Sequence, residues 1–330
     1  MRSASIRASV ISALVVLAAG CGAQNGTVPT VSSAQSGARQ RSGSSGALIY
    51  VATTKHIVIL SYPGGQIIGT IPWYGVRLDN SICSDPSNGN VFVPENNAVY
   101  EYGHGSTTPS TILAIPYEDQ YPSGCTVDPK TGDLAVIAAT QPTGRDGFLV
   151  YPGGTGTPVT YMDNKVNALY YAAYDASGDL FSVVEDGAGG QRLAELRHGQ
   201  TKFNFLKFAN CGCSWSKLQW DGKYLALAYF PGSQRSIAQL SLGRTTATLI
   251  NSVNLSDMAN RDGGNFWIYN GSVFAEYQKL RRNNNQGVGV WAYPAGGDTT
   301  ARIFGSTKGP KDGISDLTVS VAPTASQPRK

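Results

Sequence analysis

The sequence predicts an all-β protein in which one four-stranded unit recurs six times. The composition is the first reason: charged residues make up 15% of the chain, glycine occurs 39 times, and 17 tyrosines outnumber 10 phenylalanines. Such a composition is typical of turn-rich β proteins. The second reason is that two kinds of turn recur at a nearly constant spacing. The third is that short apolar or alternating runs, the pattern of β-strands, lie between these turns.

In the first kind of turn, Asp or Asn comes first and Gly follows. Asp and Asn side chains accept hydrogen bonds from the turn backbone, and Gly adopts the positive φ that such turns require. The turns begin 43 to 49 residues apart, at Asp85, Asp128, Asp175, Asp221 and Asn270. The apolar runs predicted as second strands are Leu48–Val51, Val91–Val93, Leu134–Ile137, Leu180–Val184, Tyr224–Ala228 and Val273–Ala275.

The second kind of turn reads Tyr-Pro-Gly-Gly in its clearest copies, which begin at Tyr62 and Tyr151. Less regular copies begin at Tyr102, Leu196, Leu240 and Tyr293. Third strands are predicted to run into these turns. Fourth strands follow them, as in Gln66–Ile71 and Thr111–Ile115.

Four strands in about 45 residues is the period of a β-propeller blade. The first copy lacks a first strand, and Ile314–Val321 supplies one at the C-terminal end, where Val321-Ala322-Pro323 repeats the pattern of Val127-Asp128-Pro129. Closing the ring in this way removes an unpaired strand edge. We therefore predict a six-bladed β-propeller of four-stranded blades over residues 47–323, with the C-terminal strand completing the first blade and a frayed tail at 324–330.

Residues 1–21 have the pattern of a signal peptide. Two arginines precede an uncharged run from Ala8 to Ala19, which has the length of a signal h-region and is too short to cross a bilayer. The segment Leu17–Cys21 resembles the lipobox of bacterial lipoproteins, although that family prefers a bulky aliphatic residue at the place of Ala18. The resemblance implies cleavage before Cys21 and acylation of its thiol. An ordinary secretory signal is the alternative.

The segment 22–46 has almost no large apolar side chains and is predicted to be a flexible, Gly/Ser-rich tether. We therefore expect an exported protein that is lipid-anchored in the bacterial cell envelope, at the outer membrane or cell surface. Residues 47–323 carry 20 Lys and Arg against 22 Asp and Glu. This balance lacks the basic footprint of a nucleic-acid-binding protein. We expect the body to be a monomer.

Four cysteines follow Cys21. An even number of cysteines in an exported protein favours disulfides, and four cysteines can pair in three ways. Cys83 and Cys125 precede equivalent turns and so fall in the inner strands of neighbouring blades, while Cys211 and Cys213 flank one glycine and are favoured as a pair because they share a segment. The alternatives are zinc bound by four thiolates, although the usual Cys-x2-Cys spacing is absent, and free buried thiols.

The turn motifs resemble a known group of proteins. The pattern Val127-Asp128-Pro129 to Gly132-Asp133-Leu134, with the Tyr-Pro-Gly-Gly turns, is similar to six-bladed propellers of the NHL and SMP-30/gluconolactonase-like kind and to uncharacterised bacterial propeller lipoproteins. The SMP-30 resemblance implies metal-assisted hydrolysis of a lactone or ester, with Glu, Asn and Asp holding a divalent metal at the channel mouth. Glu95, Asn167 and Asp262 have suitable types and places, and Ca²⁺ is the candidate ion.

Loops that enter the first strands, or join second to third strands, are expected to line one mouth of the channel. Their polar and aromatic residues are candidate ligand-binding residues: Trp73, Tyr74, Asp79, Tyr117, Asp119, Asp163, Trp215 and Asp262. The same loops contain Lys217 and Asp316. Surface loops are rich in such residues whether or not they bind a ligand.

The sequence contains no nucleophile-elbow Gly-x-Ser-x-Gly, P-loop or His-Glu-x-x-His motif. His104 and His198 occupy equivalent turns and are expected to face solvent. We therefore predict a non-enzymatic binding or scaffold module at the cell envelope, with a protein or polysaccharide partner at the propeller face. A metal-dependent lactonase or esterase of the SMP-30 type is the alternative.

Overall fold

The computed structural model describes residues 46–72, 81–116, 120–140, 145–186, 189–213, 216–231, 235–256, 265–278, 286–304 and 314–323. The chain divides into two compact parts, residues 1–41 and 42–330, and every described residue belongs to the second part. These residues form 24 strands and a short 3₁₀ helix at Pro152–Gly154, so the fold is all-β. Within the same ranges, no helix is long and apolar enough to cross a membrane.

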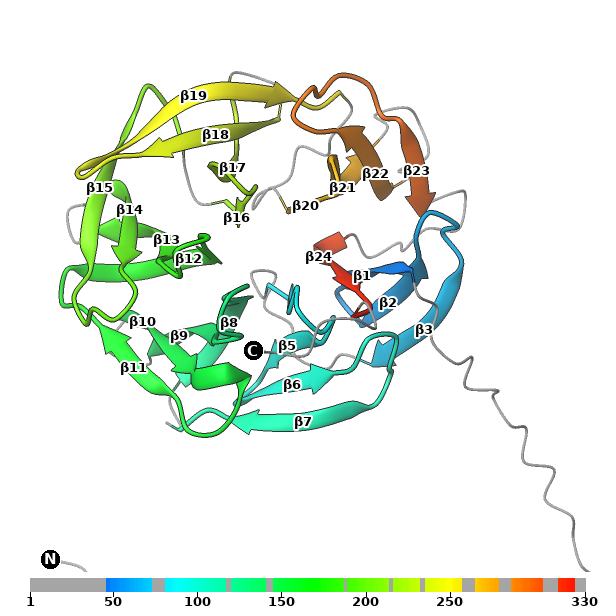
Figure 1. Ribbon diagram of the computed structural model, residues 1–330, viewed down its shortest axis with the longest axis horizontal. Coiled ribbons are helices and arrows are strands. Elements are labelled where there is room, and N and C mark those ends of the chain that lie inside the picture. The colour runs from blue at the N-terminus through cyan, green and yellow to red at the C-terminus, as the bar shows by residue number, and fades with distance from the viewer. Residues whose placement is uncertain are drawn as a thin grey trace, which may run out of the picture. The chain divides into compact units, whose positions relative to one another are not determined.

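The strands form five sheets arranged in a ring (Figure 1). Four of the sheets have four antiparallel strands each. In order around the ring, three of them are β24 (Ile314–Val321), β1 (Ala47–Thr53), β2 (His56–Ser61) and β3 (Ile67–Pro72); β4 (Cys83–Ser84), β5 (Val91–Glu95), β6 (Ala98–Tyr102) and β7 (Pro109–Ala114); and β8 (Gln120–Val127), β9 (Leu134–Thr140), β10 (Asp146–Tyr151) and β11 (Val159–Met162). The fourth is β20 (Phe266–Tyr269), β21 (Ser272–Gln278), β22 (Gln286–Ala292) and β23 (Ala301–Phe304).

The fifth sheet has eight strands. Its order is β12 (Val166–Tyr174), β13 (Leu180–Asp186), β14 (Gln191–Leu196), β15 (Asn204–Ala209), β19 (Thr246–Asn254), β18 (Ser236–Leu242), β17 (Leu225–Tyr229) and β16 (Leu218–Trp220). Each half is antiparallel, and the halves meet where β15 runs parallel to β19 over Lys207–Ala209 and Thr246–Thr248. The arrangement is therefore propeller-like, but six separate four-stranded sheets are not seen, because these two outer strands share hydrogen bonds.

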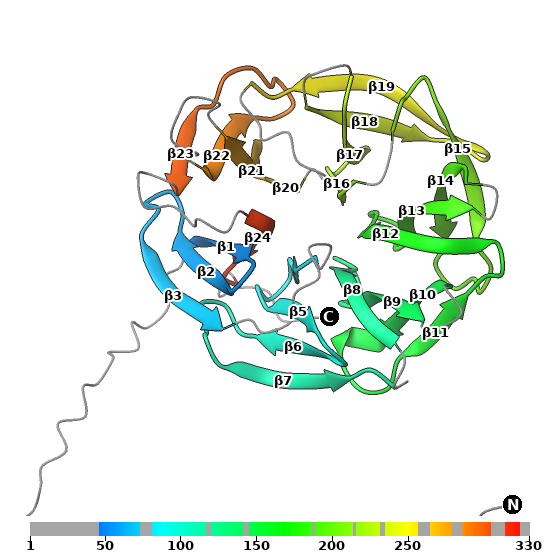
Figure 2. The ribbon, with the colours of Figure 1, turned by 180° about the vertical axis from the view of Figure 1, so that it is seen from behind.

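The C-terminal strand closes the ring. β24 pairs antiparallel with β1 from Ala47 opposite Val321 to Thr53 opposite Ile314, and Figures 1 and 2 show the two strands side by side from both faces. The prediction that Ile314–Val321 completes the first four-stranded unit is confirmed. Closure is important because β1 would otherwise present an unpaired edge.

The first kind of turn has the predicted mechanism. In four copies, one carboxylate oxygen of the turn Asp accepts a hydrogen bond from the backbone N–H two residues later. The pairs are Asp85 with Ser87 (2.7 Å), Asp128 with Lys130, Asp175 with Ser177, and Asp221 with Lys223 (2.8 Å each). The turn glycines adopt positive φ, as Gly132 does at 77°. These turns fix the link from first to second strand in four of the units.

The second kind of turn packs against the neighbouring sheet. The Gly105 backbone donates to the Tyr50 hydroxyl (2.7 Å), and Tyr151 donates to the Ala114 carbonyl (2.9 Å). The expectation for His104 is wrong: it is half-buried, with Nδ1 2.7 Å from Ser320 Oγ, because its turn packs on β24. His198 is exposed, as expected.

The core lies between neighbouring sheets. One apolar cluster joins Ile137 and Phe148 of one sheet to Leu169 and Val184 of the next, and the other clusters likewise combine residues of adjacent units. Second and third strands are covered on both faces, which explains why the sequence reads as continuous apolar runs there. Burial of these faces holds each sheet to its neighbours.

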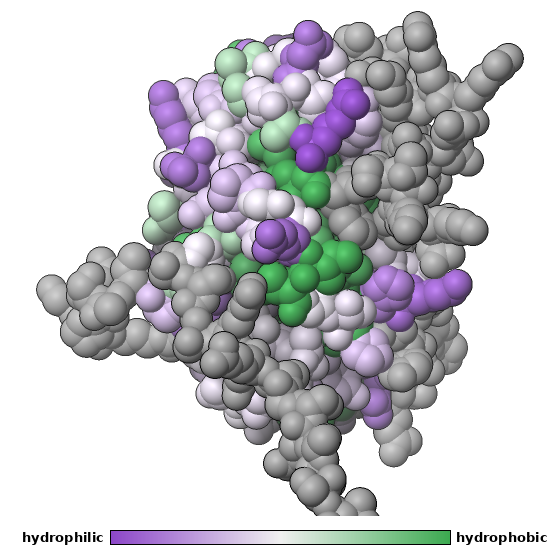
Figure 3. All heavy atoms as spheres, turned by 90° about the vertical axis from the view of Figure 1, so that its right-hand side faces the viewer, coloured by the Kyte–Doolittle hydropathy of each residue, from purple (hydrophilic) through white to green (hydrophobic). Residues whose placement is uncertain are grey.

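The outer strands are interrupted by bulges. Register shifts leave Ile68, Ser110, Ile250 and Ile303 out of the ladders of β3, β7, β19 and β23. Such bulges discourage edge-to-edge pairing between molecules. Figure 3 shows apolar surface between polar side chains on the flank at the right of Figure 1, where β3 lies with Ile67 60% exposed.

Candidate functional site

The predicted ligand residues fall largely outside the described ranges. Trp73, Tyr74, Asp79, Tyr117, Asp119, Trp215 and Asp262 all do so. Asp163 is described, and it forms the turn between β11 and β12: its side chain accepts a hydrogen bond from the Lys165 backbone (2.9 Å) and its carbonyl accepts one from Val166 (3.1 Å). Its observed role is therefore to shape a turn.

The predicted metal ligands are not seen together. Glu95 ends β5 and is only 7% exposed, whereas Asn167 is exposed on β12 in a different sheet. Asp262 lies outside the described ranges. In the part of the chain that the structure covers, no three His, Cys, Asp or Glu residues gather in a way that could hold a metal ion.

Lys217 and Asp316, which were expected among the mouth loops, form a buried ion pair. Lys217 Nζ lies 2.6 Å from Asp316 Oδ1 and donates to the Leu317 carbonyl at 2.8 Å. The other Asp316 oxygen accepts a hydrogen bond from the Ile82 backbone (2.8 Å). The two side chains are 4% and 1% exposed. The pair therefore links the sheet of β16, the closing sheet of β24 and the chain leading into β4.

Burial sets the electrostatics of this pair. It lowers the pKa of Lys217 and raises the pKa of Asp316, and in each case the partner's charge acts in the opposite direction. The Lys217 ammonium also lies 5.3 Å from the centre of the Trp267 ring on β20. Asp316 is thus committed to a contact between units and does not present a free carboxylate to a cation.

Asp146 is another carboxyl that connects neighbouring sheets. It begins β10, and its Oδ2 accepts a hydrogen bond from the Leu169 backbone on β12 at 2.8 Å. Burial raises the pKa of Asp146 to about 6, although the hydrogen bond from Leu169 acts to lower it. The ionised form at neutral pH therefore costs stability in the folded protein.

We expect Asp146→Asn to stabilise the protein at pH 7 by about 2 kcal/mol, because a rise of about two pKa units corresponds to at most about 3 kcal/mol. The folded pKa lies above the unfolded value, so the folded state keeps a proton between about pH 4 and 6 that the unfolded state releases. Wild-type stability should fall as pH rises through this window. Urea unfolding should show no gain for the variant at pH 4; an equal gain at both pH values would contradict this explanation.

The four cysteines are paired in the structure. Cys83 of β4 is bonded to Cys125 of β8, with their Cα atoms 5.6 Å apart, and Cys211 is bonded to Cys213. The first bond links the inner strands of two neighbouring sheets. The second remains within the segment that follows β15.

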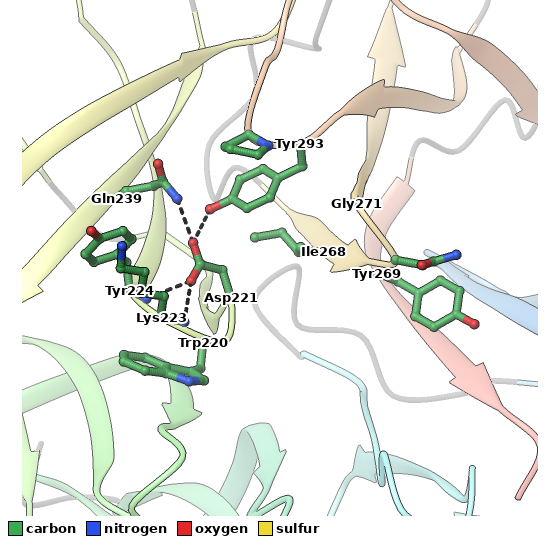
Figure 4. A pocket seen from close by; sticks show the side chains of 11 residues that line it. Trp220, Asp221, Lys223, Tyr224, Gln239, Ile268, Tyr269, Gly271 and Tyr293 are labelled. Carbon is green, nitrogen blue, oxygen red and sulfur yellow. Dashed lines mark hydrogen bonds between the residues drawn. The ribbon is translucent and has the colours of Figure 1, made fainter. Parts of the chain in front are cut away.

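A pocket of about 560 Å³ lies between the eight-stranded sheet and the sheet of β20, where the turns that link their strands come together (Figure 4). It is formed by the β16–β17, β20–β21 and β22–β23 turns together with β18. Its lining residues are Trp220, Asp221, Lys223, Tyr224, Gln239, Ile268, Tyr269, Asn270, Gly271, Tyr293 and Pro294. Sequence reasoning missed this pocket because it treated Trp220–Tyr224 only as a turn that builds the fold. The aromatic residues around two of the recurring turns were the available signal.

Asp221 organises the pocket. One carboxylate oxygen accepts hydrogen bonds from the backbones of Lys223 (2.8 Å) and Tyr224 (2.7 Å), and the other from Gln239 Nε2 (2.7 Å) and the Tyr293 hydroxyl (2.6 Å). Figure 4 shows the four donors converging on the carboxylate, two from its own turn, one from β18 and one from the turn after β22. A carboxylate offers about four lone-pair sites, so its accepting capacity is used within the protein.

The hydrogen bonds keep Asp221 ionised. Burial acts to raise its pKa, but the bonds from Tyr293, from the Tyr224 backbone and from Gln239 outweigh burial and hold the pKa below its usual value. An acid of this kind is deprotonated at neutral pH and has no spare proton to donate. Asp221 is therefore suited to positioning the walls of the pocket and is poorly suited to general acid catalysis.

The walls of the pocket are fixed by contacts within and between the sheets of β16 and β20. The Gln219 amide donates to the Ile268 carbonyl (2.8 Å) and accepts from the Ile268 backbone N–H (2.6 Å). The Tyr293 backbone donates to Gly271 (2.9 Å). At the rim, the exposed Lys223 ammonium lies 4.8 Å from the centre of the Tyr224 ring. The result is an open pocket with aromatic and polar walls.

We expect Tyr293→Phe to lower the unfolding free energy by about 1.5 kcal/mol at pH 7, because the variant loses a hydrogen bond to a charged group. The folded pKa of Asp221 is depressed, so its stabilisation is present above the unfolded value near pH 4 and is lost as pH falls through the folded pKa. The difference from wild type should therefore shrink in acid. Tyr269→Phe in the same pocket is the control, and an equal loss in both variants would contradict this role of Asp221.

Comparisons with known proteins identify the fold class. No protein-family model and no curated protein sequence matches the chain. A chain from the crystal structure of a nidogen/laminin complex matches with a TM-score of 0.58 at 12% identity, over 84% of this chain and 100% of that chain. A putative TolB from Agrobacterium tumefaciens matches with a TM-score of 0.52 at 10% identity, over 84% and 99%. Both are β-propeller proteins, and at such low identity the likeness shows the fold alone.

Proposed function

We propose that the chain is a six-bladed β-propeller of the NHL or SMP-30-like kind. In this interpretation the eight-stranded sheet is two blades joined at their outer strands. The joining pairs only three residues of β15 with three of β19, whereas each half keeps its own four antiparallel strands. The spacing of the sequence turns supports the same count.

We further propose that this propeller is a non-enzymatic binding module held at the cell envelope. Residues 1–21 would direct export, an acyl group on Cys21 would provide the anchor, and residues 22–46 would be the tether to the propeller. The observation that best supports binding is the pocket at Asp221, where three tyrosines are among the lining residues and the protein's own donors fill the accepting sites of the carboxylate. Such a cavity is organised to hold a partner.

The anchor is tested by the mass of the protein extracted from membranes. The proposal predicts a chain beginning at Cys21 that carries two or three acyl groups, and a Cys21→Ser variant that is no longer acylated. An unmodified chain cut elsewhere would show that the segment is an ordinary secretory signal. This experiment is independent of the pocket.

Binding is tested with the full chain in detergent, so that the anchor does not drive retention. The protein should sediment with lipid-extracted envelope material, and the double variant Lys223→Ala/Tyr269→Ala should not. Lys130→Ala is a matched control, because Lys130 occupies the same position of another Asp turn. Equal retention of the double variant and wild type would overturn the assignment of binding to this pocket.

A further inference from the structure

The chemistry of the pocket indicates its ligand. The aromatic faces come from Tyr224, Tyr269 and Tyr293, and Ile268 and Pro294 add apolar surface. Each tyrosine also carries a hydroxyl, and the exposed Lys223 and Asn270 contribute hydrogen-bonding groups at the rim. A sugar ring has the complementary character, with an apolar C–H face and a hydroxyl periphery. We infer that this pocket binds a carbohydrate, an inference that rests on the proposed binding function.

Two of the three tyrosines, Tyr293 and Tyr224, are held by contacts within the protein. Tyr293 is fixed at its hydroxyl by Asp221 (2.6 Å) and at its backbone by Gly271 (2.9 Å). The Tyr224 backbone donates to Asp221 (2.7 Å), and Lys223 lies over the Tyr224 ring. Preorganised walls lose little conformational freedom on binding, which favours recognition of a polar ligand whose intrinsic affinity is modest.

Two other ligand classes fit less well. A purely apolar ligand would leave the Asn270 amide and the Lys223 ammonium without a matching group at the rim. A proline-rich peptide docks in an extended aromatic groove. Here the rings line an open pocket of about 560 Å³ between three turns and β18, a volume within the range of small-molecule sites.

The Asp221 carboxylate affects which groups a ligand can contact, because its own accepting sites are already filled. Because four protein donors occupy it, the Tyr293 hydroxyl among them, sugar hydroxyls would bind to other groups, which are the exposed Lys223 and Asn270 and the hydroxyls of Tyr224 and Tyr269. Among the lining residues, Lys223 is therefore the exposed charged side chain that a bound saccharide would contact. Removing it should weaken binding without disturbing the Asp221 network, since that network uses the Lys223 backbone and not its side chain.

The test is calorimetric titration of the detergent-solubilised full chain with cellohexaose, chitohexaose, hexagalacturonate and decaproline. We expect at least one saccharide to bind, Tyr269→Ala and Lys223→Ala each to weaken that binding about tenfold, and Lys130→Ala to leave it unchanged. Thermal melting would confirm that each variant is folded. Lys223→Ala keeps the test valid should Tyr269→Ala fail to fold, because Lys223 is exposed.

Three outcomes would overturn the carbohydrate inference: no saccharide binds, saccharide binding is the same in both pocket variants as in wild type, or decaproline is the ligand that depends on the pocket. Failure here is distinguishable from failure of the proposed function. Pocket-dependent retention on envelope material without saccharide binding would leave the binding module in place and exclude a carbohydrate ligand.

Discussion

Replacing Lys217 with Met should lower the unfolding free energy by about 3 to 5 kcal/mol, because the substitution leaves the Asp316 carboxylate buried without its counter-charge. Asp316 is 1% exposed, and the hydrogen bonds that it keeps, from the Ile82 and Leu317 backbones and the Ser81 side chain, bring no positive charge. The loss should appear in urea unfolding at pH 7 as a lower midpoint. Lys130→Met, which removes an exposed lysine, should change stability by less than about 0.5 kcal/mol.

The double variant Lys217→Met/Asp316→Asn separates the pair from general damage. Asn has no charge and can still accept the hydrogen bond from Ile82, so the double variant should be more stable than Lys217→Met alone. This non-additivity is the signature of a buried ion pair. A cost below about 1 kcal/mol for Lys217→Met, or simple additivity in the cycle, would show that the pair does not connect the units in solution.

Removing the Cys83–Cys125 disulfide should cost about 4 kcal/mol. The two cysteines are 42 residues apart in sequence, and cross-linking a loop of that length restricts the unfolded chain strongly. The bond also joins the inner strands β4 and β8 of neighbouring sheets. The double variant Cys83→Ala/Cys125→Ala should therefore unfold at much lower denaturant concentration than wild type under oxidising conditions.

The second cysteine pair provides the control. Cys211 and Cys213 are two residues apart, so their bond restricts the unfolded chain far less, and Cys211→Ala/Cys213→Ala should cost about 1 to 2 kcal/mol. Mass analysis after alkylation would establish both pairings in the purified protein. Equal losses for the two double variants, or free thiols at Cys83 and Cys125, would contradict this account of the cross-link.

The repeated turns could be predicted because their physics is local. Asp128 bonds to the backbone two residues later, so the turn can be recognised from five consecutive residues. The closing strand could be predicted by counting strands, since the first unit lacked one and the C-terminal end of the chain had one more than its own unit needs. The turn signal lies within a short segment, whereas the closing strand follows from the strand count of all the units.

The buried Lys217–Asp316 ion pair and the pocket at Asp221 could not be predicted in the same way. Lys217 and Asp316 are 99 residues apart, and Tyr293 and Asp221 are 72 apart. Each contact depends on how the units are placed around the ring, which the pattern of one unit does not reveal. The pairing of β15 with β19 could not be predicted for the same reason. The two units that it joins are those in which Leu196 and Leu240 replace the turn tyrosine. Most of the predicted mouth residues lie outside the described ranges and stay predictions.

The most direct measurement is photo-crosslinking in intact cells, with a photoreactive amino acid in place of Tyr269 and, separately, in place of Tyr161 on the outer strand β11. If the pocket at Asp221 holds an envelope partner, position 269 should give a discrete adduct containing envelope material and position 161 should give none. The carbohydrate inference predicts that glycosidase treatment, and not protease treatment, reduces the added mass at position 269. No adduct at 269, or the same adduct at both positions, would contradict the central claim that this pocket is the binding site.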